Sequence, residues 1–122
     1  MVKEIDAKTT KKMVEEDDDV VLIDVLGEES YEKRHLPEAI NIPVNDERFE
    51  EKVKEAVPSK ETPVIVYCAD PPCEASPKAA KKLEEMGYKN VHDFDAGLLG
   101  WRRAGYEYAE GTGPERLSMR EL

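Results

Sequence analysis

The sequence predicts an α/β protein with a mainly parallel, five-stranded sheet covered by helices on both faces. Two stretches, residues 20–25 and 63–67, are apolar and rich in β-branched side chains along their length. Such continuous apolar runs are typical of strands that are buried on both faces. Amphipathic segments with helical spacing separate the expected strands, so strands and helices alternate along the chain. An alternating order requires crossover connections, which place successive strands parallel.

Each element has its own local signal in the sequence. The expected strands are residues 2–5, 20–25, 39–42, 63–67 and 91–94. The expected helices are residues 7–16, 28–35, 47–57, 77–86 and 97–104. Asp6 can cap the first helix, and Asn45 or Asp46 the third. Ser76 can cap the fourth helix, because Pro77 then occupies the first helical position, where its missing N–H has no cost.

Length and charge exclude several classes of protein. A chain of 122 residues indicates one domain, and its net charge of -10 argues against nucleic acid and anionic membrane surfaces as partners. No stretch approaches the length of a membrane span, and the first residues lack the apolar core of a secretory signal. We therefore expect a cytoplasmic protein whose two cysteines are kept reduced. Catalytic, redox and metal roles, or simple burial, remain for them.

The two cysteines lie in the loop between the strand at 63–67 and the helix at 77–86. Cys68 directly follows the strand and faces a helix N-terminus, where free backbone N–H groups and the helix dipole favour thiolate over thiol. Ligands of parallel sheets bind beyond the carboxyl ends of the strands. Asp24 ends the other long apolar strand. If the two strands are neighbours, we expect Cys68 and Asp24 to line one crevice.

Four segments, in this order and spacing, resemble the rhodanese family of sulfurtransferases. They are residues 21–25 with Asp24, residues 35–43, Tyr67-Cys68 with Ala79, Ala80 and Leu83, and residues 87–91 with Ala96, Gly97 and Trp101. The resemblance implies a rhodanese-like domain over residues 1–110, followed by a polar tail at 111–122. It also implies an enzyme without a cofactor that carries sulfur as a persulfide on Cys68.

The loop departs from the family pattern. The usual loop contains a glycine and an arginine and runs six residues from the cysteine to a Ser or Thr. Here the interval from Cys68 to Ser76 is eight residues, it contains neither Lys nor Arg, and Asp70 and Glu74 are acidic. Because thiosulfate is a dianion, we expect this chain to use it poorly as a sulfur donor.

The candidate catalytic residue is Cys68, whose thiolate would attack the outer sulfur of a donor; the alternative is a buried structural cysteine. The other loop residues of the candidate site are Ala69, Asp70, Pro71, Pro72, Cys73, Glu74, Ala75 and Ser76. The backbone N–H groups of five of them are expected to stabilise the charge on the terminal sulfur, namely Ala69, Asp70, Cys73, Glu74 and Ala75. Pro71 and Pro72 cannot donate.

Two further residues have open roles. Cys73 can resolve the persulfide, form a disulfide with Cys68, or only pack. Asp24 either orders the loop or a water molecule, or it is a turn residue at the end of its strand. His35 is expected to be structural, and His92 to be either structural or exposed.

Other chemistries fit the residues less well. Two cysteines with four residues between them and two distant histidines do not match zinc spacing, so no metal is expected. A thioredoxin-like motif needs two intervening residues. A rhodanese-like phosphatase needs an arginine where Ala75 stands. The expected partners are a small-molecule or protein persulfide donor and a thiol acceptor, and the oligomeric state is open. The rival interpretation is a non-catalytic rhodanese-like module that binds another protein.

Overall fold

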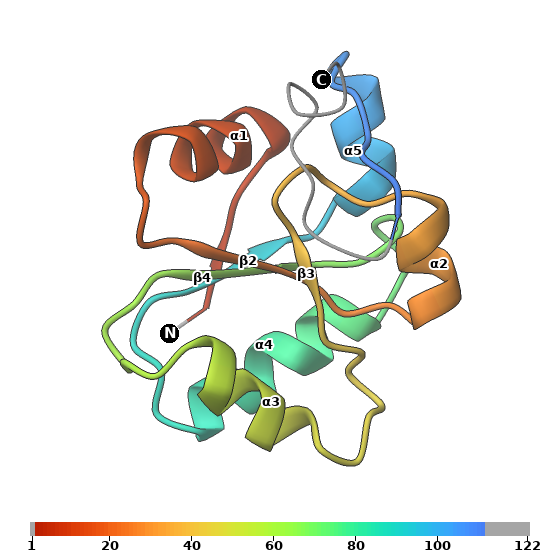
Figure 1. Ribbon diagram of the computed structural model, residues 1–122. Coiled ribbons are helices and arrows are strands. Elements are labelled where there is room, and N and C mark those ends of the chain that lie inside the picture. Colours follow the sequence, from red (N-terminus) through yellow and green to blue (C-terminus); the bar gives the residue numbers. More distant parts are fainter. Residues whose placement is uncertain (1, 112–122) are drawn as a thin grey trace.

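The computed structural model describes residues 2–111 and shows five strands in the order β1-β5-β4-β2-β3, with every neighbouring pair parallel (Figure 1). The strands are β1 (Lys3–Glu4), β2 (Val21–Asp24), β3 (Ile40–Asn41), β4 (Val64–Tyr67) and β5 (Val91–Phe94). The helices are α1 (Ala7–Glu16), α2 (Glu28–Lys33), α3 (Phe49–Ala56), α4 (Ala75–Glu85) and α5 (Gly97–Arg103). The predicted fold class is therefore confirmed.

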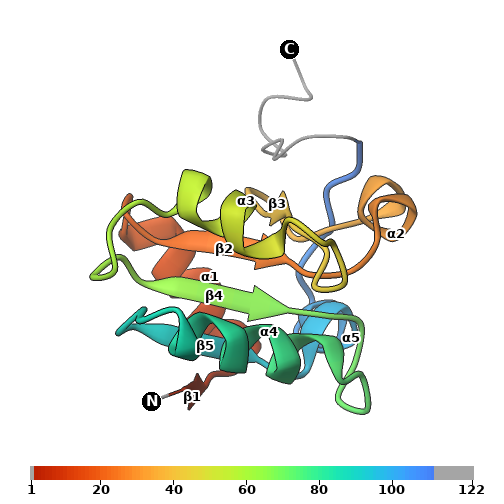
Figure 2. The same ribbon diagram turned by 90° about the horizontal axis from the view of Figure 1, so that it is seen from below.

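Helices cover both faces of the sheet (Figures 1 and 2). Each face has its own apolar cluster. On one face, α3 and α4 contribute Phe49, Val53, Ala79, Ala80 and Leu83 to the cluster. On the other face, α1, α2 and α5 contribute Ala7, Tyr31, Leu98 and Trp101. This two-sided burial explains why β2 and β4 are apolar along their length.

The central strand β4 positions the start of the cysteine loop. All four residues of β4 are buried with no exposed surface, and β2 and β5 flank the strand on either side. Side chains alternate between faces, so Val66 and Cys68 belong to the α3–α4 cluster, whereas Ile65 and Tyr67 belong to the opposite one. Cys68 thus leaves the sheet beneath the start of α4.

Two helix starts differ from the expected ones. α4 begins at Ala75 with Glu74 in the cap position, so Ser76 lies inside the first turn and does not cap the helix. Glu74 already has helical backbone angles, which starts the helix earlier than the proline signal indicated. α3 begins at Phe49, and Asp46 accepts a hydrogen bond from the N–H of Arg48 instead of capping the helix.

Two further expectations concern the polar tail and the absence of a membrane span. The polar tail expected at 111–122 lies, beyond Gly111, outside the described residues. Among residues 2–111, the helices are too short and too polar to cross a membrane.

Candidate active site

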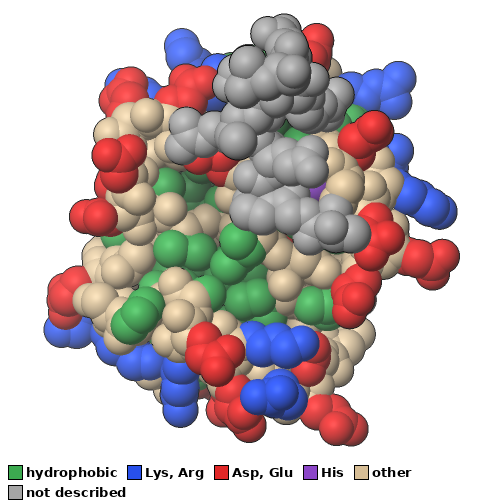
Figure 3. Space-filling model, in the orientation of Figure 1, with side chains coloured by type: hydrophobic (Ala, Val, Ile, Leu, Met, Phe, Trp, Pro, Cys, Tyr) green, Lys and Arg blue, Asp and Glu red, His purple; other side chains and the backbone are tan. Residues whose placement is uncertain are grey.

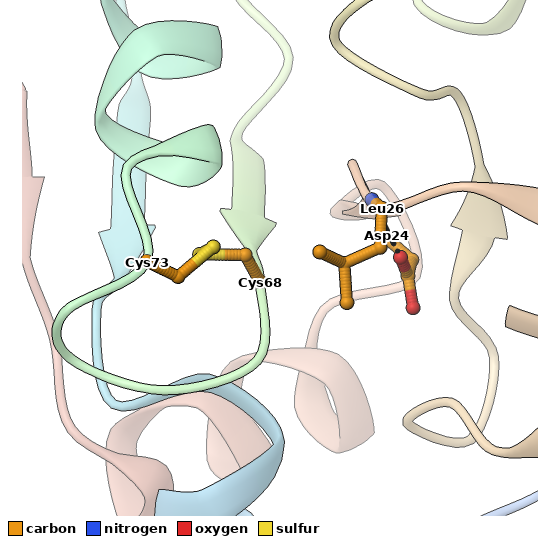
Figure 4. Close-up of a disulfide and its surroundings, with 4 residues drawn as sticks. All are labelled: Asp24, Leu26, Cys68 and Cys73. Carbon is orange, nitrogen blue, oxygen red and sulfur yellow. Dashed lines mark hydrogen bonds between the residues drawn. A yellow bond between two sulfur atoms is a disulfide. The ribbon is translucent and has the colours of Figure 1, made fainter. Parts of the chain in front are cut away.

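The loop from Cys68 to Glu74 folds back on itself at its two prolines. The N–H of Cys73 donates to the carbonyl oxygen of Asp70 at 3.0 Å, which closes a turn over Pro71 and Pro72. The turn brings the cysteines together, with their Cα atoms 6.4 Å apart, and they form a disulfide (Figure 4). This separation is within the range of ~4.4–6.8 Å that disulfides adopt. The expectation that both thiols are reduced is therefore not met in this structure.

The two sulfur-bearing residues differ in exposure. Cys68 has no exposed surface, whereas Cys73 is partly exposed, as are its loop neighbours Asp70 and Ala75. A reagent from solution therefore reaches the Cys73 side of the disulfide first.

The loop that carries the disulfide contains several backbone N–H groups without an acceptor. Within residues 2–111, the amides of Ala69, Asp70, Glu74 and Ala75 donate to neither a backbone nor a side-chain oxygen. They are four of the five donors expected from the sequence; the fifth, that of Cys73, is used in the turn. Free amides near a strand end and a helix start make a binding place for negative charge. The loop can therefore stabilise an anionic sulfur without a basic side chain.

The start of α5 holds the first two residues of the loop. The N–H groups of Leu98 and Leu99 donate to the carbonyl oxygens of Cys68 and Ala69 at 3.0 and 2.9 Å. Gly97 makes this approach possible, because a Cβ atom there would lie 2.1 Å from Cys68 O. Its φ of +58° also favours glycine. The sequence reasoning noted Ala96-Gly97 as part of a resemblance but missed this supporting role.

Asp24 does not share a crevice with Cys68. It pairs in register with Tyr67, so its side chain projects from the face of the sheet opposite to that of Cys68. Asp24 is fully buried and accepts hydrogen bonds from the N–H of Leu26 at 2.9 Å and the hydroxyl of Tyr67 at 2.7 Å. Figure 4 shows its carboxylate pointing away from the disulfide, with the Leu26 side chain on the near side.

Burial shifts the pKa of both partners in this hydrogen bond. It raises the pKa of Asp24 to about 6, against the opposing effect of the hydrogen bonds from Tyr67 and Leu26. Burial, together with the charge of Asp24, also raises the pKa of Tyr67 well above its ordinary value. Of the two roles left open for Asp24, these contacts favour that of a turn residue at the end of its strand, because its carboxyl group accepts the N–H of Leu26 and lies on the face opposite to Cys68.

A second buried acid lies under the first turn of α4. Asp93 on β5 is 4% exposed, and burial raises the pKa of its carboxyl group. Ser76 is fully buried, and neither its hydroxyl oxygen nor Asp93 Oδ1 forms a hydrogen bond of ordinary geometry. The first turn of α4 therefore rests on polar groups rather than on a purely apolar surface.

The other candidate residues lie away from the loop. His35 is fully buried, stacks on Tyr31, and has its Nδ1 atom 2.8 Å from Tyr31 O, which agrees with a structural role. A cavity of about 630 Å³ lies between α1 and the end of α5, and Cys68 does not line it. Within residues 2–111, no cluster of three or more His, Cys, Asp or Glu side chains is placed to hold a metal ion.

The comparisons with known proteins agree on one family. The model of the rhodanese-like domain family matches residues 6–104. Thiosulfate sulfurtransferase GlpE of Coxiella burnetii is 32% identical over 85 residues, which are 69% of this chain and 73% of that protein. The HTH-type transcriptional regulator Rv0324 of Mycobacterium tuberculosis is 32% identical over 94 residues, which are 77% of this chain but 39% of that protein.

A solved structure agrees with these matches. The BH2092 protein of Bacillus halodurans superposes with a TM-score of 0.79 at 28% identity, over 98% of this chain and 89% of that chain. The fold, the family model and the relatives identify one class of protein. The chain belongs to the rhodanese-like domain family, which includes proteins named thiosulfate sulfurtransferases.

Proposed function

We propose that this chain is a sulfurtransferase that carries sulfane sulfur as a persulfide on Cys68 and passes it to a thiol or another nucleophilic acceptor. The observation that carries this proposal is the set of free amides in the loop that begins at a buried cysteine at the end of β4. A free amide lowers the energy of a nearby thiolate or persulfide anion, and relatives of this chain are named sulfurtransferases.

The reaction has two displacement steps. In the first, the Cys68 thiolate attacks the outer sulfur of the donor, the sulfur–sulfur bond of the donor breaks, and the rest of the donor leaves as an anion. In the second, an acceptor nucleophile attacks the outer sulfur of the Cys68 persulfide, and the thiolate is regenerated. Both steps follow the rules of thiol–disulfide exchange, in which the thiolate is the reactive form. The disulfide seen here must be reduced before the first step.

Persulfide loading tests this proposal. The reduced wild-type protein and its Cys68→Ser and Cys73→Ser variants are incubated anaerobically with a peptide persulfide and examined by mass spectrometry. We expect Cys73→Ser to gain one sulfur on Cys68 and Cys68→Ser to gain none, because only Cys68 sits at the strand end. Loading of Cys68→Ser with none on Cys73→Ser would assign the carrier role to Cys73. If no form gains sulfur or releases sulfide, the chain is a non-catalytic module instead.

A further inference from the structure

We infer that Cys73 is the resolving nucleophile of this site, so that the Cys68 persulfide is discharged as hydrogen sulfide within the molecule. The inference rests on the proposed function, because it needs the persulfide on Cys68. It adds the identity of the first acceptor, the product, and a requirement for a dithiol reductant.

The turn over the two prolines places Cys73 for this step. The hydrogen bond from Cys73 N–H to Asp70 O holds the turn, and the disulfide shows that Cys73 Sγ can bond with the inner sulfur, Cys68 Sγ. Attack on the inner sulfur differs from ordinary transfer, in which an acceptor attacks the outer sulfur. A thiol only five positions away also acts at an effective concentration on the order of mM, so a dilute external acceptor competes poorly.

The chemical step balances with groups that the chain carries. The Cys73 thiolate attacks Cys68 Sγ, a bond forms between the two cysteine sulfurs, and the bond from Cys68 Sγ to the outer sulfur breaks. The outer sulfur leaves as HS⁻ with its own proton and takes up two electrons, which the two cysteines lose as they form the disulfide. The free amides of Ala69, Asp70, Glu74 and Ala75 favour this step by stabilising the departing anion.

The exposure of the two cysteines sets the route back to the reduced protein. Cys73 is partly exposed and Cys68 is buried, so a dithiol reductant attacks Cys73 Sγ. Cys68 then leaves as a thiolate whose charge the free amides of the loop stabilise. The second thiol of the reductant displaces Cys73 and completes the cycle. The net reaction turns a persulfide and a dithiol into a thiol, sulfide and a disulfide.

A single-turnover experiment tests the inference. The reduced proteins receive one equivalent of glutathione persulfide under anaerobic conditions, and sulfide and protein mass are measured. We expect the wild type to release one equivalent of sulfide and to lose two hydrogens without keeping extra sulfur. We expect Cys73→Ser to keep the sulfur on Cys68 and to release almost no sulfide. Cys68→Ser serves as the control that does neither.

The outcomes separate the inference from the proposed function. One contrary result is that Cys73→Ser takes up sulfur, while the wild type also keeps the sulfur on either cysteine and releases no sulfide. Cys73 is then not the resolving nucleophile, and Cys68 remains a carrier. If Cys73→Ser takes up no sulfur although circular dichroism shows it folded, the proposed function fails and the inference fails with it.

Turnover with a reductant gives a second readout. With glutathione persulfide and dithiothreitol below about 1 mM, we expect Cys73→Ser to release sulfide at least about tenfold more slowly than the wild type, since the effective concentration of Cys73 is then lost. Equal rates for the two proteins would overturn the inference.

Discussion

The pair formed by Asp24 and Tyr67 shows how one buried carboxyl group connects three segments on the face of the sheet opposite to Cys68. The Asp24 carboxyl group accepts hydrogen bonds from the N–H of Leu26, just after β2, and from the hydroxyl of Tyr67. The Tyr67 hydroxyl oxygen in turn accepts a hydrogen bond from the N–H of Leu36. One side chain thus joins the ends of β2 and β4 to the segment after α2. A buried acid in such a network favours its neutral form, because burial penalises the charge.

Asp24 makes stability depend on pH with a definite sign. Its pKa in the folded protein is about 6, above the ordinary value of ~4, so protonation favours the folded state. The stabilisation is present below pH ~4 and is lost as the pH rises from ~4 to ~6, by about 3 kcal/mol. We expect the unfolding free energy of the wild type, relative to that of Asp24→Asn, to fall by about this amount between pH 3 and pH 7 in urea titrations.

The comparison between the two proteins cancels the contributions of other titrating groups to the pH dependence. Asp93 is one such group, because burial also raises the pKa of its carboxyl group. An unchanged difference between the two pH values would show that Asp24 is not the group responsible.

At the scale of elements, the site depends on one close contact between the start of α5 and the end of β4. Gly97 packs its Cα against the carbonyl of Cys68, and the two following amides bind the backbone of the loop. The contact orients the first residues of the loop without a side chain. Its loss should therefore change the loop directly, not only the stability of the fold.

We expect Gly97→Ala to destabilise the protein and to alter the reactivity of Cys68. A left-handed backbone costs a non-glycine residue ~1–2 kcal/mol. In addition, a Cβ atom at this position would lie 2.1 Å from Cys68 O, so the loop must shift. Gly105→Ala is the matched control, because its φ is +89° but nothing lies within 4 Å of the added Cβ.

The measurements are the unfolding free energy and the rate of Cys68 alkylation in the Cys73→Ser background. Gly97→Ala should lower the unfolding free energy by at least ~1 kcal/mol more than Gly105→Ala does. Only Gly97→Ala should change the rate of Cys68 alkylation. Equal effects of the two substitutions on both quantities would contradict the role assigned to Gly97.

At the scale of the whole molecule, negative charge opposes anionic substrates. The net charge is -10, and Figure 3 shows acidic side chains at many points around the rim of one face. The loop adds Asp70 and Glu74, and it has no basic side chain of its own. Nearby Lys78 on α4 directs its Nζ toward Asn45 Oδ1, at 3.4 Å. The free amides are therefore the principal source of positive potential within the loop.

The negative charge of the loop, which no basic side chain of the loop offsets, predicts that the chain uses thiosulfate poorly as a sulfur donor. Two like unit charges ~6 Å apart repel by ~0.7 kcal/mol in water and by ~3 kcal/mol at an effective dielectric constant of ~20. At ~1.4 kcal/mol per tenfold in rate, a loss of one to two powers of ten relative to a cation-lined loop is expected. We expect kcat/KM for thiosulfate to rise in Asp70→Asn, Glu74→Gln and Ala75→Arg.

The gain should be largest at low salt, because ions screen exposed charges beyond ~10 Å at 0.1 M. Pro71→Ala is the neutral control in the same loop. Efficient turnover by the wild type, or no gain in any of the three variants, would rule out electrostatic exclusion.

Much of the fold was predictable because its signals are local. Continuous apolar runs marked β2 and β4, amphipathic spacing marked the helices, and Asp6 does cap α1 through the N–H of Thr9. The position of Cys68 at the end of a buried strand also followed from the order of residues. The start of α4 was predicted wrongly, because the backbone of Glu74 enters the helical region before the proline signal.

Only the tertiary structure decided how these parts meet at the site. The face on which Asp24 projects depends on the register of β2 against β4, and a shift of one residue would have placed it beside Cys68. The contact of Gly97 with Cys68 joins segments from different strands and helices. The pairing of Cys68 with Cys73 depends on the path of the backbone through two prolines. Each of these is a relation in space between residues, which composition and spacing along the chain do not specify.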